Sequence, residues 1–600
     1  MILKSSFNHI NEFFLILSSQ IRKFYLNSSI YNNKISKINE GDLQYTPSPN
    51  LLDCIIKYNK KKKNIEDYFI NSIWTNKKII NNSHKNLHNF FWLFSLDLKS
   101  SKKITQSIIS NWIDLNHNYD QNTWEIDTLS KRLISWISNS QLTYDESSKE
   151  YRDKFNNIIK KQINHLVSEI NRSELVDNKM VGCSAIILAG LSYQEKENYL
   201  NYGQNLLKKI INSSFDQDGF PKSRNLRQLS FYLKYLILIR EWLKESNSEI
   251  PEYINEIIFR LGNAYNFIWQ SIKQPLLFNG NHESNNSELD KYLESYGYKF
   301  NNKNNFIGGY AAFKNKRFAL VMDLGTSPEK KFSSNYQSGC LSFEFLYMNQ
   351  KIICNSGYFQ KYNHQLNRIS KSSANHSTLI IDNRSSAKFK KNLSGISIVD
   401  KGVKILKKNF ILEKNYWNLN GSHDGYLKEY GIIHERQVEF FPDKFKLIGN
   451  DKLIKKRNFK SSNFEKNWGP FLYKDKLHFV YDINPLKVFE ILKNKGWEFQ
   501  YEKDKVILGV ESVEDSIVFH AGTKNDGMIK TNGGRVIALT SFGENIKSIL
   551  LAGLSGNFEI AKHFTLPLDR ISIKSFSSIN FAKNLCITFS SFGSVIIMSI

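Results

Sequence analysis

Cysteine is scarce in this 600-residue chain, which has only five. They are Cys54, Cys183, Cys340, Cys354 and Cys586. None forms a CxxC pair, so the sequence encodes neither a cysteine zinc cage nor a disulfide framework. Long apolar runs are missing as well. No segment approaches the ~18 apolar residues of a transmembrane helix, and the patch from Phe13 to Leu17 is too short for a clear signal peptide.

Acidic residues are outnumbered, since 82 Lys and Arg face 57 Asp and Glu, a net charge of +25. This excess favours an anionic partner, which could be nucleic acid, anionic lipid or acidic polysaccharide. AT-rich codon usage would give a chain rich in Lys, Asn and Ile the same charge without any partner. Hydrophobic residues make up 41%, which excludes disorder of the low-hydrophobicity kind for most of the chain.

Two hydrophobic periods divide the sequence. From about residue 40 to 285, apolar residues recur three and four positions apart, as in Phe155, Ile158, Ile159, Ile163, Leu166 and Ile170. After about residue 295 the period is two, as in Phe318-Ala-Leu-Val-Met-Asp323. Helices first and strands second predict an α+β multidomain protein rather than a single α/β sheet. We expect stacked helical hairpins, in a toroid or solenoid, followed by a large antiparallel sandwich.

A consecutive set of phrases in the strand half resembles one family. They are Gly339-Cys-Leu-Ser-Phe-Glu344, Ile353-Cys-Asn-Ser-Gly357, Ser373-Ala-Asn-His-Ser-Thr-Leu379, Ser422-His-Asp-Gly-Tyr426, Gly431-Ile-Ile-His-Glu-Arg436 and Gly496-Trp497. Their order and spacing are similar to the C-terminal domain of heparinase II/III-like proteins. In the helical half, Asp218-Gly219, Ser223-Arg-Asn225 and Leu277-Phe-Asn-Gly280 are similar to a bacterial branch of that family.

The resemblance implies a fold and an activity. We expect an N-terminal (α/α) incomplete toroid followed by a large antiparallel β-sandwich, with the active cleft between them. The expected segments are an extension at 1–40, the toroid at 41–290, the sandwich at 296–546 and a tail at 547–600 that adds strands. The implied activity is that of a polysaccharide lyase on uronic-acid polymers such as heparin, heparan sulfate or alginate. Relatives of this kind work in the cell envelope or periplasm, whereas the lack of a clear signal peptide leaves the cytoplasm open.

Eliminative cleavage removes the proton at C5 of a uronate and expels the oxygen at C4. It needs a group that neutralises the carboxylate, a base and an acid. The resemblance implies catalytic roles for Arg224, Asn225, His376 and Tyr232, with Arg224 as a bidentate carboxylate clamp. It implies substrate binding by Asn279, His282, Gln337, His423 and Tyr426.

Several of these residues also have a structural alternative. Ser223 would cap a helix and leave Arg224 on the surface, and Tyr232 would pack in a helical core. His376 would be a hydrogen-bonded histidine at a sheet end, and His423 to Tyr426 would form a hairpin turn.

The chain departs from the family at positions that matter for chemistry. Where active relatives carry an Asn-His pair, this chain has Lys179-Met-Val-Gly-Cys-Ser-Ala185. The positions that hold a catalytic histidine and a metal in relatives are Asn335, Gln337, Asn355 and His376. Zinc prefers His, Cys and carboxylates to amides, so we expect no metal and no cofactor.

A second function therefore stays open, namely a glycan-binding or cell-envelope protein without catalysis. Nucleic-acid binding rests on net charge alone and has no fold signature. The sequence implies no particular oligomeric state.

Overall fold

The structure is a computed structural model of the 600-residue chain. The described residues are 17–37, 41–48, 51–52, 81–96, 101–193, 199–282, 285–355, 357–360, 362, 365–381, 384–392, 394–444 and 446–456, together with strand segments between 476 and 531. Two compact units are interleaved in the sequence. Unit 1 is drawn from Met1–Phe215, Phe231–Phe259 and Lys291–Tyr296, and unit 2 from Asp216–Ser230, Arg260–Asp290 and Gly297–Ile600. The expected tail at 547–600 lies outside the described residues.

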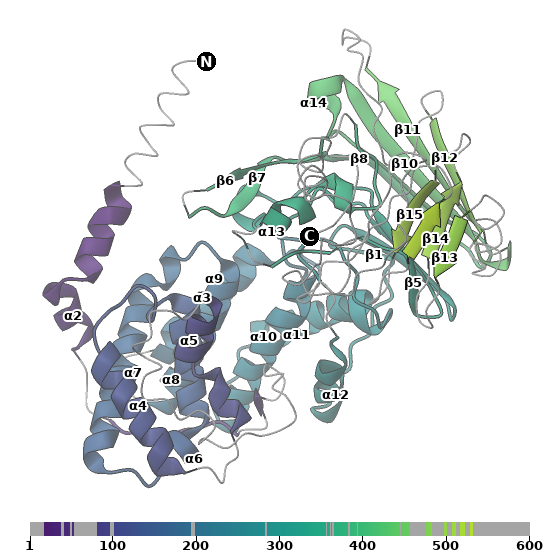
Figure 1. The fold of residues 1–600 in the computed structure, drawn as a ribbon. Helices are drawn as coiled ribbons and strands as arrows, with labels where there is room; N and C mark the ends of the chain where they lie inside the picture. The colour runs from purple at the N-terminus through teal and green to yellow at the C-terminus, as the bar shows by residue number, and fades with distance from the viewer. Residues whose placement is uncertain are drawn as a thin grey trace. The chain divides into compact units, whose positions relative to one another are not determined.

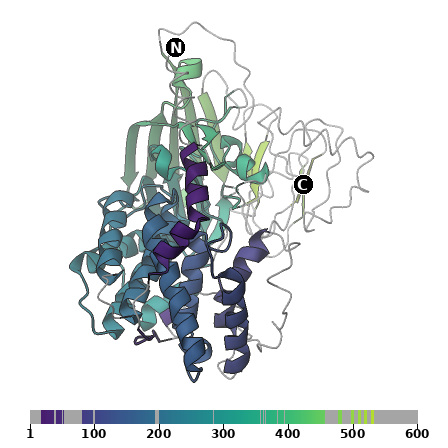
Figure 2. The same ribbon diagram turned by 90° about the vertical axis from the view of Figure 1, so that its left-hand side faces the viewer.

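Unit 1 is helical (Figure 1). Its helices are α2 (Ser29–Ile35), α3 (Asn81–His88), α4 (Lys102–Asn116), α5 (Ile126–Ser138), α6 (Ser140–Thr143), α7 (Lys149–Glu169), α8 (Val176–Ser192) and α9 (Tyr199–Ser214). Three further helices cross the unit boundary, and they are α10 (Arg227–Glu245), α11 (Glu252–Tyr265) and α12 (Ser287–Ser295). The longer helices of unit 1 run alongside one another (Figure 2). No helix among the described residues is long and apolar enough to cross a membrane.

Helix α7 shows why these segments are helical. Ser148 caps its start by accepting a hydrogen bond from the Tyr151 N–H. The predicted face from Phe155 to Ile170 is buried, so the periodicity is confirmed. Helix α8 is apolar on nearly all sides and packs against both α5 and α9. A Cβ at Gly203 of α9 would lie 2.6 Å from Ile187, so glycine is needed for this close approach.

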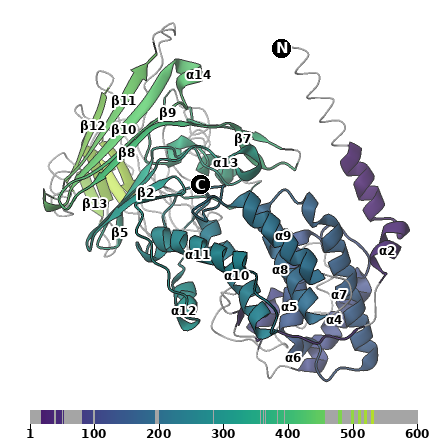
Figure 3. The same cartoon turned by 180° about the vertical axis from the view of Figure 1, so that it is seen from behind.

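Unit 2 contains two main antiparallel sheets (Figures 1 and 3). The first has the order β1-β2-β3-β4-β5, with β1 (Phe306–Ile307), β2 (Tyr310–Lys314), β3 (Phe318–Asp323), β4 (Phe343–Tyr347) and β5 (Gln350–Ile353). The second has the order β15-β14-β12-β11-β10-β9-β8, with β8 (Ile405–Leu412), β9 (Trp417–His423), β10 (Ile432–Phe441), β11 (Lys446–Lys455), β12 (Lys476–Asp482), β14 (Ile507–Glu511) and β15 (Ile517–Ala521). Two small ribbons pair β6 (Lys388–Lys391) with β7 (Ser397–Lys401), and β13 (Trp497–Gln500) with β16 (Met528–Thr531).

Aromatic rings from the two main sheets pack together. Phe440 of β10 lies 4.8 Å from Phe318 and 5.0 Å from Phe345 between ring centroids, and 5.1 Å from Trp417. Large aromatic side chains of this kind dominate the energy of a core. Alternate residues of β10 are buried, as expected for a strand with one face in that core. The predicted order of helices followed by antiparallel strands is confirmed.

Candidate functional site

Arg224 is buried and fully engaged within unit 2. It follows α9 in a loop with a positive φ of 59°. Its guanidinium donates to the carbonyls of Gly308 (3.1 Å), Gly325 (3.1 Å) and Gly309 (3.3 Å). Nη2 also lies 2.6 Å from Oδ1 of Asp323. Burial alone lowers the pKa of the guanidinium, but Asp323 and other neighbours outweigh it and leave the pKa raised.

Asp323, at the end of β3, joins Arg224 to the next part of the site. Its Oδ2 accepts a hydrogen bond of 2.9 Å from Asn279, and its Oδ1 accepts one of 3.0 Å from the Gly325 N–H. Every residue of β3 is buried, so this carboxylate would be costly without its partners. The sequence analysis did not single out Asp323. The only signal was an acidic residue that closes an apolar strand before Leu324-Gly325.

Asn279 and Gln337 continue the network through neutral amides. Asn279 donates to the Tyr310 hydroxyl at 2.7 Å and accepts from the Gln337 N–H at 3.2 Å. The Gln337 side chain accepts from the Gly280 N–H (3.0 Å) and donates to the carbonyls of Gly357 (3.0 Å) and Ser370 (2.6 Å). With no exposed surface, Gln337 stabilises four chain segments against one another.

Asn225 and His376 each keep unused hydrogen-bonding groups. Asn225 accepts from the Arg227 N–H at 3.0 Å, while its Nδ2 makes no hydrogen bond among the described residues. A Cβ on Gly280 would lie 2.5 Å from the Asn225 amide, so only glycine fits there. His376 is 3% exposed and neither ring nitrogen makes a side-chain hydrogen bond within the described part of the chain. Burial lowers the pKa of His376 to about 3, so its ring is neutral at pH 7.

The other predicted residues are placed in the protein interior. His282 lies 2.9 Å through Nδ1 from Nε2 of Gln360. The Tyr232 hydroxyl, in unit 1, donates to Asp177 at 2.7 Å. Tyr426 was expected to line an open cleft, but it is 1% exposed and its hydroxyl donates to the carbonyl of Leu379. The pattern around Tyr426 marks a packed corner of the sheet.

His423 was also expected in a cleft, but it belongs to a buried hydrogen-bonded chain on the neighbouring strands β9, β10 and β11. We call this chain the buried relay; its members are His423, His434, Asp451 and Arg436. The Gly425 N–H donates to His423 Nδ1 at 3.0 Å, so His423 carries its proton on Nε2. That nitrogen lies 3.1 Å from His434 Nδ1, and His434 Nε2 lies 2.6 Å from Asp451. Arg436 holds the same carboxylate through two bonds of 2.7 and 2.6 Å.

Protonation in this relay follows from its burial. Burial lowers the pKa of both His423 and His434 below the ordinary value. Burial alone raises the pKa of Asp451, but Arg436 and His434 outweigh it and hold the pKa well below its usual range. At pH 7 the relay therefore consists of two neutral rings and one buried ion pair.

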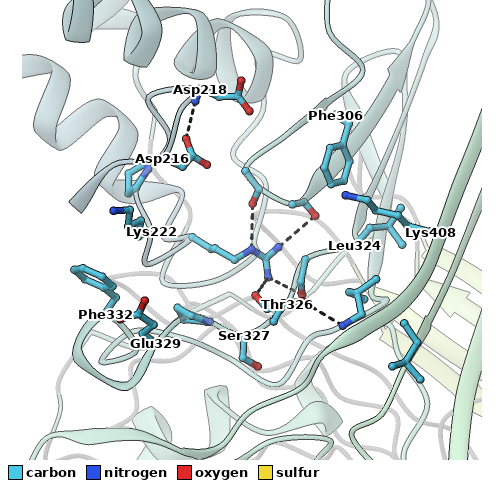
Figure 4. Close-up of a pocket in the computed structure, with 18 of the residues that line it drawn as sticks. Asp216, Asp218, Lys222, Phe306, Leu324, Thr326, Ser327, Glu329, Phe332 and Lys408 are labelled. Atoms are coloured by element: carbon cyan, nitrogen blue, oxygen red, sulfur yellow. Dashed lines mark hydrogen bonds between the residues drawn. The ribbon is translucent and has the colours of Figure 1, made fainter. Parts of the chain in front are cut away.

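An open pocket of about 570 Å³ lies beside Arg224, entirely within unit 2 (Figure 4). We call it the β8 pocket. Its lining includes Asp218, Phe306, Thr326, Glu329, Lys407 and Lys408. Lys407 and Lys408 belong to β8, which is the edge strand of the second sheet. No local pattern in the sequence indicates this pocket, because its walls come from segments that are spread over more than 180 residues of the chain.

The metal positions of the family do not fit a metal here. Gln337 is saturated by backbone groups, and Asn355 accepts from the Ser377 N–H at 3.0 Å and donates to Glu344 at 3.3 Å. His376 is then the one imidazole of the set. The described residues contain no group of three or more His, Cys, Asp or Glu able to hold a metal ion. The site therefore offers amides where zinc needs stronger donors.

Comparison with known families gives the β-rich part of the chain an identity. Residues 307–533 match the heparinase II/III-like C-terminal domain. These residues belong to the heparinase II/III-like family. The matched segment includes Asp323, Gln337, His376 and the whole buried relay.

Solved structures agree at the level of the fold. The chain is similar to the crystal structure of heparinase III, with a TM-score of 0.51 and 13% identity over 80% of this chain and 81% of that chain. The heparan sulfate lyase HepC from Pedobacter heparinus has a TM-score of 0.48 and 14% identity, over 80% of this chain and 79% of that chain. The similarity to heparinase III shows the fold alone, which is heparinase III-like.

Curated relatives match only a short stretch. Phosphoribosylamine–glycine ligase of Caldanaerobacter subterraneus is 41% identical over 58 residues, which is 10% of this chain and 14% of the relative. The same enzyme of Nostoc sp. is 42% identical over 65 residues, 10% of this chain and 15% of the relative. The chain therefore spans less than a sixth of the length of these two relatives, too little to carry their activity over.

Proposed function

We propose that the chain is a polysaccharide lyase-like protein that cleaves an acidic, uronate-containing polysaccharide by elimination. The observation that carries the proposal is the heparinase II/III-like domain at 307–533, set in a heparinase III-like fold. The proposal includes an (α/α) incomplete toroid at 41–290 and a β-sandwich at 296–546. The aromatic packing of Phe440 against Phe318 and Phe345 supports the sandwich.

The proposed chemistry assigns roles to the residues identified from the sequence. His376 would take the C5 proton, since its ring is neutral at pH 7 and its two ring nitrogens make no side-chain hydrogen bond among the described residues. Arg224 and Asn225 would neutralise the uronate carboxylate, and for Arg224 this requires the substrate to displace some of its protein acceptors. Asn279 and Gln337 would support these groups through the amide network.

Glycan binding without cleavage is the second candidate. A specific observation favours it, because the groups that should meet substrate are already bonded to protein. Arg224 is paired with Asp323, and Gln337 uses both of its amide atoms on backbone groups. A buried group whose donors are all bonded to protein has none left for a substrate unless those bonds break.

The test is the ultraviolet absorbance of the unsaturated uronate that elimination leaves at a new chain end. We expect the full-length protein to raise this absorbance with heparan sulfate, heparin or alginate, and to leave a neutral β-glucan unchanged. His376→Gln should abolish the rise while circular dichroism stays unchanged. Binding of these glycans in affinity electrophoresis without any absorbance change would establish the second candidate. If the protein neither binds nor cleaves these glycans, both candidates are refuted.

A further inference from the structure

We propose that the β8 pocket is a subsite for an acidic sugar unit, holding its carboxylate or sulfate on one side and its hydroxyls on the other. The inference rests on the proposed function and adds the place and the chemistry of recognition. The pocket volume of about 570 Å³ falls in the range of ligand-binding clefts. It is built by β8, the start of β1, the loop after β3 and the loop before α10.

The basic side of the β8 pocket is shaped by a β-bulge. The pairing of β8 with β9 shifts register between Ile405 and Lys407, and such bulges redirect side chains. Lys408 Nζ lies 4.1 Å from the ring centroid of Phe306, a cation–π contact that holds the ammonium at the wall. Phe306 is itself supported by stacking on Phe410, with ring centroids 5.7 Å apart and planes 14° apart.

The ammonium group of Lys408 is available for an anionic ligand. It makes no ion pair with a carboxylate in the described part of the chain, and it is exposed. Its neighbour Lys407 approaches Glu435 only at 3.9 Å, with a side chain that is 60% exposed. An exposed pair at this distance contributes little. Two ammonium groups at a pocket wall favour a carboxylate or sulfate.

Acceptor groups face this basic side. In Figure 4, Glu329 and Lys408 lie on opposite sides of the pocket, Asp218 lies at a third edge, and Lys222 lies on the same side as Glu329. Ionised carboxylates only accept hydrogen bonds. They therefore favour a ligand that brings hydroxyl donors to the pocket together with its anionic group. A sugar with one acidic group and several hydroxyls satisfies both sides.

Arg224 forms a rigid base for the pocket as long as its guanidinium stays bonded to its protein acceptors. Asp323 neutralises its charge, and its guanidinium is clamped by the Gly308, Gly309 and Gly325 carbonyls. A Cβ on Gly325 would lie 2.2 Å from the guanidinium carbon, so this packing depends on glycine. The pocket is thus pre-formed, which reduces the ordering that ligand binding must impose.

The experiment is calorimetric titration of the full-length protein with a heparan sulfate tetrasaccharide, an alginate tetrasaccharide and neutral cellotetraose. The pocket variant is Lys407→Ser/Lys408→Ser, and a second is Asp218→Asn/Glu329→Gln. The matched control is Lys391→Ser/Lys414→Ser, which removes the same charge from exposed positions of unit 2 outside the pocket. We expect the lysine pocket variant to weaken binding of an acidic tetrasaccharide about tenfold, with a flatter salt dependence, and the control to change it by less than about twofold.

The outcomes separate this inference from the proposed function. If the parent binds an acidic tetrasaccharide and the pocket variant binds equally well, the subsite is refuted while the proposed function stands. Equal losses in the pocket variant and the control mean a diffuse charge effect, and this also refutes the subsite. Stronger binding of the acidic tetrasaccharides by Asp218→Asn/Glu329→Gln would contradict the hydroxyl-accepting side. If the parent binds no acidic tetrasaccharide, both proposals are wrong.

Discussion

Asp451 lies at the centre of the buried relay, so its replacement should greatly lower the free energy of unfolding of unit 2. Its carboxylate accepts two bonds from Arg436 and one from His434, all between 2.6 and 2.7 Å. The Arg436 and Asp451 side chains are 1% and 0% exposed. Asp451→Asn keeps the shape but leaves the guanidinium buried without a counter-charge. It also turns an amide N–H₂ toward groups that only donate.

The expected loss is large because a buried charge without its partner is costly. Breaking such a pair by removing one member costs about 3–5 kcal/mol. The exposed pair of Asp400 with Lys390, 3.7 Å apart, gives a matched control. Asp400→Asn should cost at most about 1 kcal/mol. Removing both charges in Asp451→Asn/Arg436→Met should cost less than the sum of the single variants, because no unpaired guanidinium remains.

Urea unfolding at pH 7.5 measures these differences, and peptide-level hydrogen exchange assigns them to a region. We expect faster exchange in β10 and β11, which carry Arg436 and Asp451 opposite each other, and unchanged exchange in α7. A loss below about 1 kcal/mol, or exchange that rises equally in both units, would refute the view that this ion pair holds the sheet together.

Three other outcomes follow from the same contacts. Burial lowers the native pKa of His376 to about 3, so the native state binds fewer protons than the unfolded state between pH 3 and about 6.5. The free energy of unfolding therefore falls as the pH drops through this range, by up to about 1.4 kcal/mol per pH unit. His376→Gln should remove this contribution and flatten the dependence of the unfolding free energy on pH. An unchanged slope in urea unfolding would contradict this. Gly309→Ala should lower the free energy of unfolding by about 2–3 kcal/mol, because φ is +86° and the new Cβ would lie 2.8 Å from Arg224. Gly395→Ala is the control: φ is +75° but the new Cβ meets open space, so the loss should be only about 1–2 kcal/mol. Arg224→Lys should lower thermal stability by about 2–4 kcal/mol because one ammonium cannot reach the acceptors of the planar fork; an unchanged melting temperature would show that the fork is dispensable.

Local pattern was enough to predict the order of elements. The spacing from Phe155 to Ile170 is satisfied by one helix face, and the segment from Phe318 to Asp323 forms one strand that is buried on both faces. Both depend only on neighbours in the chain. The family phrases, such as Gly339 to Glu344, likewise identified a domain that residues 307–533 match. The order of helices followed by antiparallel strands, and the family, were therefore accessible from the sequence alone.

Partners of the buried polar groups were not accessible in the same way. Arg224 and Asp323 are 99 positions apart, and nothing local to either one specifies the other. His434 stands opposite His423, and Arg436 opposite Asp451, only because β9, β10 and β11 pair in that register. The same registers buried His423, and the contact of the Tyr426 hydroxyl with the carbonyl of Leu379 accompanies the burial of Tyr426; the sequence alone left both free to line a cleft.

Sequence by itself determined where helices and strands form, because hydrophobic periodicity is a property of consecutive residues. Tertiary structure alone decided which charges are paired and which remain available. Strand register and loop closure join Arg224 to Asp323 and Arg436 to Asp451, whereas Lys408 is left at a pocket wall. The physical reason is that desolvation and Coulomb energies depend on distances in space, and only the folded chain sets them.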